Sequence, residues 1–213
     1  MRFTTLFCDL DDTLYPASSG LWQMIKERIG QFMHERICIP LEDVPQVRLQ
    51  YFQEYGTALR GLEANYSINR EEYLTYVHDL PLADYLQPDA ELHSVLKALP
   101  IRKLILTNSD AAHARRVLAV LQIEDCFDAI VDINTILPYC KPQPEALAIA
   151  LKIANESDPS RCVLIDDLSR TTRAAREFGF FSILFGQDGS SPDADATLQH
   201  WRDLPAILNG KPS

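Results

Sequence analysis

The sequence predicts an α/β fold, in which helices cover a mainly parallel sheet and a small helical cap is inserted after the first strand. Two observations lead to this prediction. Short apolar runs, rich in β-branched and aromatic residues, alternate with segments of helical periodicity along most of the 213 residues. In addition, one long interval directly after the first apolar run shows helical periodicity alone.

The apolar runs are too short for helices and are predicted to be buried strands. They are residues 3–8, 101–106, 127–133, 162–165 and 180–185. Helices are expected between them, over residues 88–99, 110–121, 144–154 and 169–178. Because strands and helices that alternate in this way form right-handed βαβ units, we expect ligands at the carboxyl ends of the strands.

The interval after the first strand contains no convincing strand. Apolar residues such as Ile25 and Ile29 recur there at helical spacing. A further helix is predicted over residues 47–55, and Asn69 with Glu72 has the spacing of a capping box at the start of another. The interval is therefore predicted to be a small helical bundle.

We interpret residues 15–85 as a helical cap subdomain, and residues 1–14 with 86–213 as a Rossmann-like core. The insertion follows the first strand directly, which favours a lid over the strand ends. Helices that only enlarge the core are the alternative.

The composition disfavours several classes of protein. Thirty Asp and Glu against 20 Lys and Arg give a formal net charge of -10, so a nucleic acid duplex or an anionic membrane surface would repel the chain. The five cysteines lack a C-x-x-C pair, which argues against a disulfide framework or a zinc site. With no stretch typical of a signal peptide or a membrane span, a cytoplasmic protein is expected. Its oligomeric state is not indicated.

Three acids stand within four positions at the end of the first predicted strand: Asp9, Asp11 and Asp12. In strand geometry the side chains of Asp9 and Asp11 point the same way, and their charges would repel at short range. A cation would relieve this repulsion, most simply Mg²⁺, which prefers carboxylate oxygens. A solvated turn is the alternative, since Asp is common in turns.

Polar residues also follow the second predicted strand, and a lysine precedes the helix predicted over residues 144–154. Thr107 and Asn108 lie just ahead of a helix N-terminus, which suits a phosphoryl group, although Ser109 or Asp110 as a simple N-cap explains the pattern equally well. Lys141 precedes a proline near a helix start, where its charge forgoes a favourable helix-dipole interaction. This suggests a binding role, although Lys141 taken alone is explained more simply as a surface lysine.

Asp166 and Asp167 form a second acid pair, after the fourth strand and before a helix. Either could be an N-cap. Taken together with the groups at the other strand ends and with Lys141, however, the pair matches what a Mg²⁺-dependent phosphoryl-transfer site requires.

These motifs together resemble those of the haloacid dehalogenase-like hydrolase superfamily. They are D-x-D-x-T at residues 9–13, Thr107 after a strand, Lys141 before a proline, and the acid pair at 166–167, spanning residues 3–185 in the superfamily's order. The resemblance implies a phosphomonoester hydrolase.

The resemblance also implies a role for each of the first two acids. Asp9 would attack phosphorus to form an aspartyl-phosphate, and Asp11 would protonate the leaving alkoxide and later deprotonate the attacking water. Dehalogenases of the superfamily lack an acid at the position of Asp11, so its presence favours phosphatase or phosphomutase chemistry. Asp12 would be a structural turn residue.

The remaining motif residues are implied to hold the metal and the phosphoryl group. Mg²⁺ would be bound by the carboxylates of Asp9 and Asp166, by the backbone carbonyl of Asp11, and by Asp167 directly or through water. The phosphoryl oxygens would be neutralised by Thr107, Lys141 and Asn108.

Within the superfamily, residues 54–62 resemble the Y-G-x-x-L-R-G-L stretch of pyrimidine 5′-nucleotidases, and residues 9–15 and 80–82 fit the same subgroup. The substrate would then be a nucleoside monophosphate such as UMP or CMP, with Arg60 as a candidate substrate contact in the cap. Alternatively, the two glycines of the stretch shape a helix-turn and Arg60 is a surface or packing residue.

Two other functions involve the same kinds of residue. A phosphatase or phosphomutase of another small phosphate ester, such as a phosphosugar or pyridoxal phosphate, would share every catalytic residue. A receiver-like phospho-signalling domain also combines acids, Thr and Lys around Mg²⁺, but its acid pair follows the first strand, whereas here a second pair follows Lys141.

Overall fold

The computed structural model describes residues 2–210, and these divide into two compact units. The core unit comprises the described residues up to Ala17 and from Leu86 onward, and the insert unit is Ser18–Tyr85. Within residues 2–210 no helix has the length and apolar character needed to cross a bilayer.

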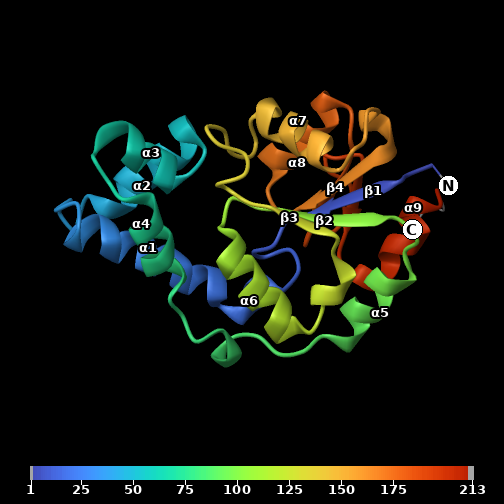
Figure 1. Ribbon diagram of the computed structural model, residues 1–213, viewed down its shortest axis with the longest axis horizontal. Coiled ribbons are helices and arrows are strands. Elements are labelled where there is room, and N and C mark those ends of the chain that lie inside the picture. The colour runs from blue at the N-terminus through green and yellow to red at the C-terminus, as the bar shows by residue number, and fades with distance from the viewer. Residues whose placement is uncertain (1, 211–213) are drawn as a thin grey trace. The chain divides into compact units, whose positions relative to one another are not determined.

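The core unit is built on a six-stranded sheet in the order β3-β2-β1-β4-β5-β6, and every neighbouring pair is parallel (Figure 1). The strands are β1 Thr5–Cys8, β2 Arg102–Leu106, β3 Ala129–Val131, β4 Cys162–Asp166, β5 Phe181–Phe185 and β6 Ala196–Leu198. The chain first builds outward from β1 to β3 and then returns to place β4 on the other side of β1. The order therefore reverses at β1, the position where ligand sites form in such sheets.

The register sets the level at which the central strands end. Cys8 of β1 is paired with Ile105 of β2 and with Ile165 of β4. The residues that follow these partners therefore emerge together at the carboxyl edge of the sheet. β1, β2 and β4 are fully buried except for Arg102 at the start of β2, as expected of strands covered on both faces.

The sixth strand was not predicted. Ala196–Leu198 pairs in parallel with β5, from Ile183 opposite Ala196 to Phe185 opposite Leu198. Three residues are too few to show a hydrophobic period, so only the pairing partner reveals an edge strand of this length.

Helices cover both faces of the sheet, with α7 and α8 on one side and α5 and α6 on the other (Figure 1). The helices of the core unit are α5 Ala90–Ala98, α6 Ala111–Leu121, α7 Pro144–Ile153, α8 Ser169–Phe178 and α9 Leu204–Leu208. Short 3₁₀ turns lie at Ala17–Ser19, Glu124–Cys126, Pro159–Arg161 and Trp201–Asp203. The α8 helix ends as predicted at Gly179, whose φ of 107° is the left-handed conformation that favours glycine.

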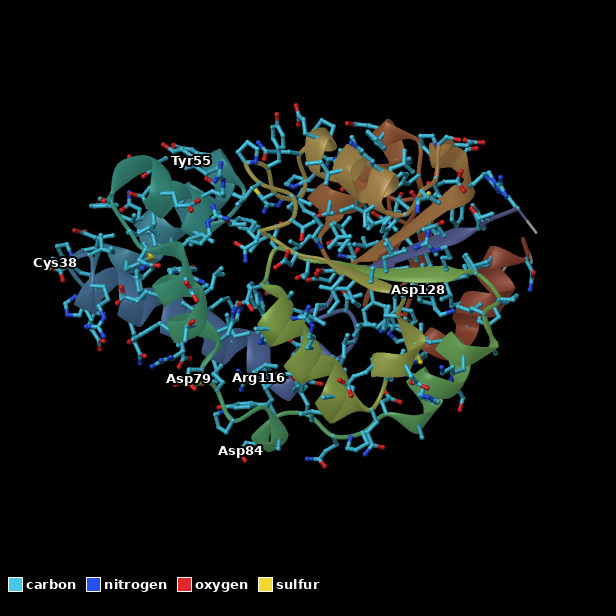
Figure 2. The ribbon with its side chains drawn as sticks, in the orientation of Figure 1. Cys38, Tyr55, Asp79, Asp84, Arg116 and Asp128 are labelled. Atoms are coloured by element: carbon cyan, nitrogen blue, oxygen red, sulfur yellow. The ribbon has the colours of Figure 1, made fainter. Side chains whose placement is uncertain are left out.

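The apolar core lies beneath α7 and α8. Phe7 of β1 stacks on Phe180 with ring centroids 5.5 Å apart, and both pack in one cluster with buried residues such as Leu147. Asp128, labelled in Figure 2, lies just before β3. Its carboxylate accepts a 2.8 Å hydrogen bond from the backbone N–H of Lys103 on β2. The strand ends are thus held by packing and by local polar contacts.

The insert unit is a helical bundle, and its described residues include no strand. Its helices are α1 Leu21–Glu35, α2 Val44–Tyr55, α3 Ala58–Asn65 and α4 Arg70–His78, with a 3₁₀ turn at Leu82–Asp84. The predicted capping box is present, since the Asn69 side chain accepts from the backbone N–H of Glu72.

The α3 helix was not predicted from the sequence, where a helix-turn shaped by the two glycines was one alternative for this stretch. Gly61 lies inside the helix and is required for packing: a Cβ there would stand 2.2 Å from Cγ of Tyr51 on α2. Gly56, with φ of 88°, ends α2. Both glycines therefore serve helix packing and helix termination.

Candidate active site

Three strand ends meet at the switch point of the sheet. Asp9 follows β1 and its backbone N–H donates to the carbonyl of Ile165 on β4, at 2.9 Å. Thr107 follows β2 and is bonded in the same way to Val131 of β3, at 3.0 Å. Asp166 is the last residue of β4 and is completely buried. The register therefore brings together three predicted site residues that are widely separated in sequence.

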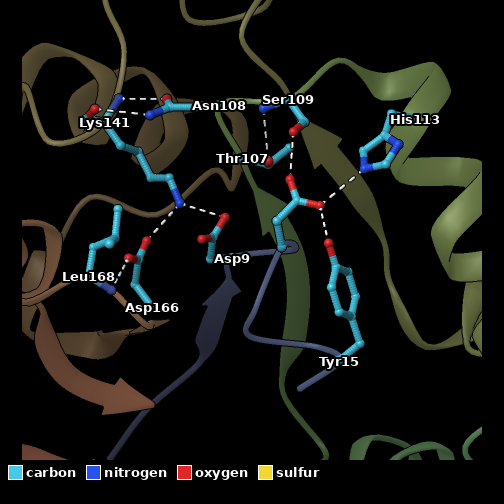
Figure 3. A network of polar contacts seen from close by, with 10 residues as sticks. Asp9, Tyr15, Thr107, Asn108, Ser109, His113, Lys141, Asp166 and Leu168 are labelled. Atoms are coloured by element: carbon cyan, nitrogen blue, oxygen red, sulfur yellow. Dashed lines mark hydrogen bonds and ion pairs between the residues drawn. The ribbon is translucent and has the colours of Figure 1, made fainter. Parts of the chain in front are cut away.

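Lys141 joins two of these strand ends (Figure 3). Its Nζ lies 2.7 Å from Oδ1 of Asp9 and 2.7 Å from Oδ2 of Asp166. All three residues are buried, and Lys141 is only 3% exposed. Burial alone would lower the pKa of Lys141, but the charges of Asp166 and Asp9 outweigh it and raise that pKa above its ordinary value. The ammonium group therefore stays charged.

Asn108 holds the backbone of Lys141 in place. Its Oδ1 accepts from the backbone N–H of Lys141 at 2.8 Å, and its Nδ2 donates to the carbonyl of Lys141 at 3.0 Å. This reciprocal pair links the end of β2 to the loop before α7. The observed contacts of the Asn108 amide thus orient the lysine.

The donor set fits a hard divalent cation. One carboxylate oxygen from each of Asp9, Asp166 and Asp167 lies within 4.8 Å of the others. Burial raises the pKa of Asp9, against the opposing charge of Lys141, and burial followed by the charge of Asp166 raises the pKa of Asp167 to about 7. One ammonium group does not balance three acids, so these oxygens suit Mg²⁺, which prefers carboxylate ligands.

The Asp11 carboxylate is directed elsewhere. It accepts hydrogen bonds from Tyr15 Oη at 2.6 Å, from His113 Nε2 at 3.0 Å and from Ser109 Oγ at 2.6 Å (Figure 3). Burial favours a raised pKa for Asp11, but the His113 ring and these hydrogen bonds outweigh it and hold that pKa below the ordinary range. These bonds involve the Asp11 side chain, whereas the metal contact predicted for this residue is through its backbone carbonyl.

The loop between β2 and α6 has several local contacts. The Thr107 hydroxyl oxygen accepts from the backbone N–H of Ser109 at 3.0 Å, and Thr107 is only 1% exposed. Asp110 is the N-cap of α6 and accepts from the backbone N–H of His113 at 2.9 Å. The N-cap interpretation is therefore correct for Asp110, whereas Ser109 bonds to Asp11.

Asp12 adopts the predicted turn role. Its φ of 55° lies in the left-handed region that Asp tolerates better than most residues. The backbone N–H of Leu14 then closes the turn on the carbonyl of Leu10 at 3.0 Å. The turn carries the chain from β1 toward Tyr15.

The Arg60 side chain contacts another residue of the insert unit. Its guanidinium group forms an ion pair with Glu63 on α3 at 2.9 Å, and Glu63 also accepts from Arg70 Nε at 2.7 Å. All three side chains are about one-quarter exposed or less. These contacts are those of a packing residue, and substrate contact by Arg60 stays a prediction.

Sequence reasoning missed Tyr15 and His113 and assigned Ser109 only a capping role. The available signal was His113, a polar residue on the face of the predicted helix that also carries Ala114 and Val117. A histidine on an apolar helix face requires a buried polar partner. The sequence does not reveal which residue that partner is.

The sequence matches the model of a known protein family. A family model described as haloacid dehalogenase-like hydrolase matches residues 3–179. The chain belongs to this hydrolase family. The predicted enzyme class is thereby confirmed, as is the predicted α/β fold with a helical insert after the first strand.

The chain is also similar to individual proteins and solved structures. The chain is 30% identical over 192 residues to phosphate metabolism protein 8 of Saccharomyces cerevisiae, a match that covers 84% of this chain but only 60% of the yeast protein. A predicted phosphoglycolate phosphatase of Haemophilus somnus has a similar structure, with a TM-score of 0.65, 17% identity, and coverage of 98% of this chain and 99% of that one.

A second solved structure of this fold is the magnesium-bound HAD-hydrolase YfnB of Bacillus subtilis. The TM-score is 0.63 at 18% identity, with 98% of this chain and 100% of that chain covered. At these identities the two structures show a shared fold.

Proposed function

We propose that this family member is a Mg²⁺-dependent phosphomonoester hydrolase that acts through an aspartyl-phosphate on Asp9. The observation that carries the proposal is the arrangement around Asp9: a buried carboxylate 2.7 Å from the Lys141 ammonium group, with oxygens of Asp166 and Asp167 within 4.8 Å. A nucleophilic carboxylate, a fixed cation and a set of metal ligands are the parts that phosphoryl transfer requires.

The reaction has two displacements at phosphorus. A carboxylate oxygen of Asp9 attacks, the bond between phosphorus and the ester oxygen breaks, and the leaving alkoxide takes a proton from Asp11. Water then attacks the aspartyl-phosphate and gives its proton to Asp11, which releases inorganic phosphate and restores both acids. This cycle requires Asp11 to be protonated when the ester binds, although its surroundings favour the ionised form in the free protein.

The other residues act on charge and position. Lys141 neutralises phosphoryl oxygens, and Thr107 contributes its hydroxyl group, while Asn108 keeps the lysine backbone in place. Asp9, Asp166, Asp167 and the Asp11 carbonyl would hold Mg²⁺. When bound, the metal supplies positive charge to the phosphoryl oxygens and orients the ester for in-line attack.

For the substrate, we propose a pyrimidine nucleoside monophosphate such as UMP or CMP. The support is the resemblance of residues 54–62, 9–15 and 80–82 to the pyrimidine 5′-nucleotidase subgroup. Residues 54–62 span the end of α2 and most of α3, where Gly61 and Tyr51 pack closely. The stretch therefore has a structural role in the insert, and base selectivity through Arg60 is the additional role proposed here.

The test is phosphate release from a panel of esters, each with Mg²⁺ and with EDTA. The panel contains UMP, CMP, dUMP, AMP, GMP, pyridoxal phosphate and several sugar phosphates. A Mg²⁺-dependent preference for pyrimidine monophosphates supports both proposals. A Mg²⁺-dependent preference for another ester keeps the chemistry and overturns the nucleotidase assignment, and absence of release from every ester overturns both.

The covalent step is tested separately. Asp9→Asn removes the nucleophile and is expected to abolish turnover while substrate still binds. Asp128→Asn is the matched control, because Asp128 is an acid of the same unit whose recorded contact is to the backbone of β2. Near-normal turnover by Asp9→Asn would overturn the aspartyl-phosphate mechanism.

A further inference from the structure

Three side chains from three separate segments converge on the carboxylate of Asp11. Tyr15 comes from the loop after β1, Ser109 from the loop after β2, and His113 from the first turn of α6. Their donor atoms lie 2.6, 2.6 and 3.0 Å from the carboxylate oxygens. Ser109 and His113 are 98 and 102 residues away from Asp11 in the sequence, so the convergence is a product of the fold.

The three donors are themselves well fixed. Tyr15 is 2% exposed, Ser109 6% and His113 1%. His113 is held at the start of α6, where its backbone N–H donates to the N-cap Asp110. Donors this buried have little rotational freedom, so they define one orientation of the carboxylate they contact.

The way the donors divide between the two oxygens matters for proton transfer. A carboxylate has about four lone-pair positions. Tyr15 and His113 both bond to Oδ1, and Ser109 bonds to Oδ2. The bonds from described residues therefore use both positions of Oδ1 and one of Oδ2. The second position of Oδ2 stays available for a proton that moves to or from a substrate.

We infer that Tyr15, Ser109 and His113 are positioning residues that fix the Asp11 carboxylate for proton transfer to the leaving group. The inference rests on the proposed function, because it assigns a task to the acid of that reaction. General acid catalysis depends on the donor lying within hydrogen-bond reach of the leaving oxygen. A carboxylate released from its three partners samples other orientations and spends less time in the productive one.

The test compares two aryl phosphates that differ in their need for an acid. The p-nitrophenolate group leaves readily without a proton, whereas the leaving group of phenyl phosphate is more basic and depends on one. The kcat/KM value covers the steps up to ester cleavage, so it isolates the step in which Asp11 acts as an acid. The variants are Tyr15→Phe, Ser109→Ala, His113→Ala and His113→Gln.

We expect kcat/KM for phenyl phosphate to fall roughly 10- to 100-fold in Tyr15→Phe, Ser109→Ala and His113→Ala, because losing one of three positioning contacts forfeits only part of the roughly 10²–10⁴-fold that general acid catalysis contributes. For p-nitrophenyl phosphate we expect a loss of about threefold or less, because this ester gains little from the acid. His113→Gln retains an N–H donor and should recover part of the loss on phenyl phosphate.

Two control variants match these substitutions in type. Ser182→Ala removes another buried hydroxyl of the core unit, one that donates to Asp195 at 3.2 Å. His93→Ala removes a histidine on α5 that contacts Asp125 at 3.2 Å. Both should leave the ratio of the two kcat/KM values unchanged. Thermal unfolding of each variant shows how far stability alone changes.

The possible outcomes separate this inference from the proposed function. Equal losses on both esters, or no loss in any of the three variants, would overturn the positioning role. If Asp11→Asn shows the selective loss on phenyl phosphate and the three variants do not, only the positioning role fails. If the wild-type protein hydrolyses neither these esters nor any of the metabolite panel, the proposed function fails and this inference with it.

Discussion

The ion pair between Lys141 and the two acids Asp9 and Asp166 should be a large contributor to both stability and activity. Lys141→Met keeps most of the side-chain volume but removes the ammonium group that lies 2.7 Å from each acid. Removing one partner of a buried ion pair typically costs about 3–5 kcal/mol, because the remaining charge is left buried without compensation. Two acids lose their partner here, so we expect a loss in this range when metal is removed by EDTA.

A matched control is available in the same unit. Lys97 forms an ion pair of nearly the same length with Asp125, at 2.8 Å, but both side chains are substantially exposed. Solvent screens such a pair, and Lys97→Met should change the free energy of unfolding little. The two variants remove the same ammonium group from ion pairs of nearly equal length, and the pairs differ chiefly in how buried they are.

The assay is urea unfolding of the wild type and both variants in EDTA, followed by kcat/KM on the preferred ester with Mg²⁺. In addition to the stability loss, Lys141→Met should lower kcat/KM by about 10²–10³-fold, the usual effect of removing one electrostatic contact to the transition state. If Lys141→Met destabilises no more than Lys97→Met, the argument from burial is wrong. If kcat/KM is unchanged, Lys141 does not act on the phosphoryl group.

Three other predictions follow from the site and the insert. The pKa of Asp167 is raised to about 7, so the folded protein holds this proton more tightly than the unfolded chain does. The contribution of Asp167 to the free energy of unfolding is therefore complete below its ordinary pKa and is lost as the pH rises through 7. In EDTA, Tm should fall between these two pH values, and MgCl₂ should reduce the fall. Asp167→Asn should flatten the EDTA profile, and an unchanged profile would contradict the assignment. Gly61→Ala places a Cβ 2.2 Å from the Tyr51 ring and should cost about 1–3 kcal/mol in denaturant unfolding. Gly30→Ala is its control, since that Cβ would meet Val44 at 3.2 Å, and equal effects would refute the packing argument. Asn108→Ala should lower kcat clearly while changing Tm little, because it frees the Lys141 backbone. A change in Tm with unchanged kcat would contradict this role.

The sequence by itself determined most of the framework. Apolar runs locate β1, β2, β4 and β5, and helical periodicity with capping signals locates the helices α5 to α8. These features are readable because each depends on residues within a few positions of one another. The same local character made the acids at strand ends visible as candidates, since parallel strands bring their carboxyl ends to one edge.

Short elements and close packing were decided by tertiary structure. The β6 strand is defined by its pairing with β5, and three residues carry no readable period. The α3 helix contains Gly61, which suggests a turn in sequence and is accommodated in a helix because Tyr51 packs against it. In both elements a long-range contact outweighs the local preference.

The contacts that give each site residue its surroundings were also decided by tertiary structure. Asp11 receives donors from Ser109 and His113 about a hundred residues away, and Asn108 bonds to the backbone of Lys141 across 33 positions. A sequence pattern reports which groups are present and how they repeat along one element. It contains no measure of the distance between side chains on different elements, because that distance is set only when the strands pair and the helices pack.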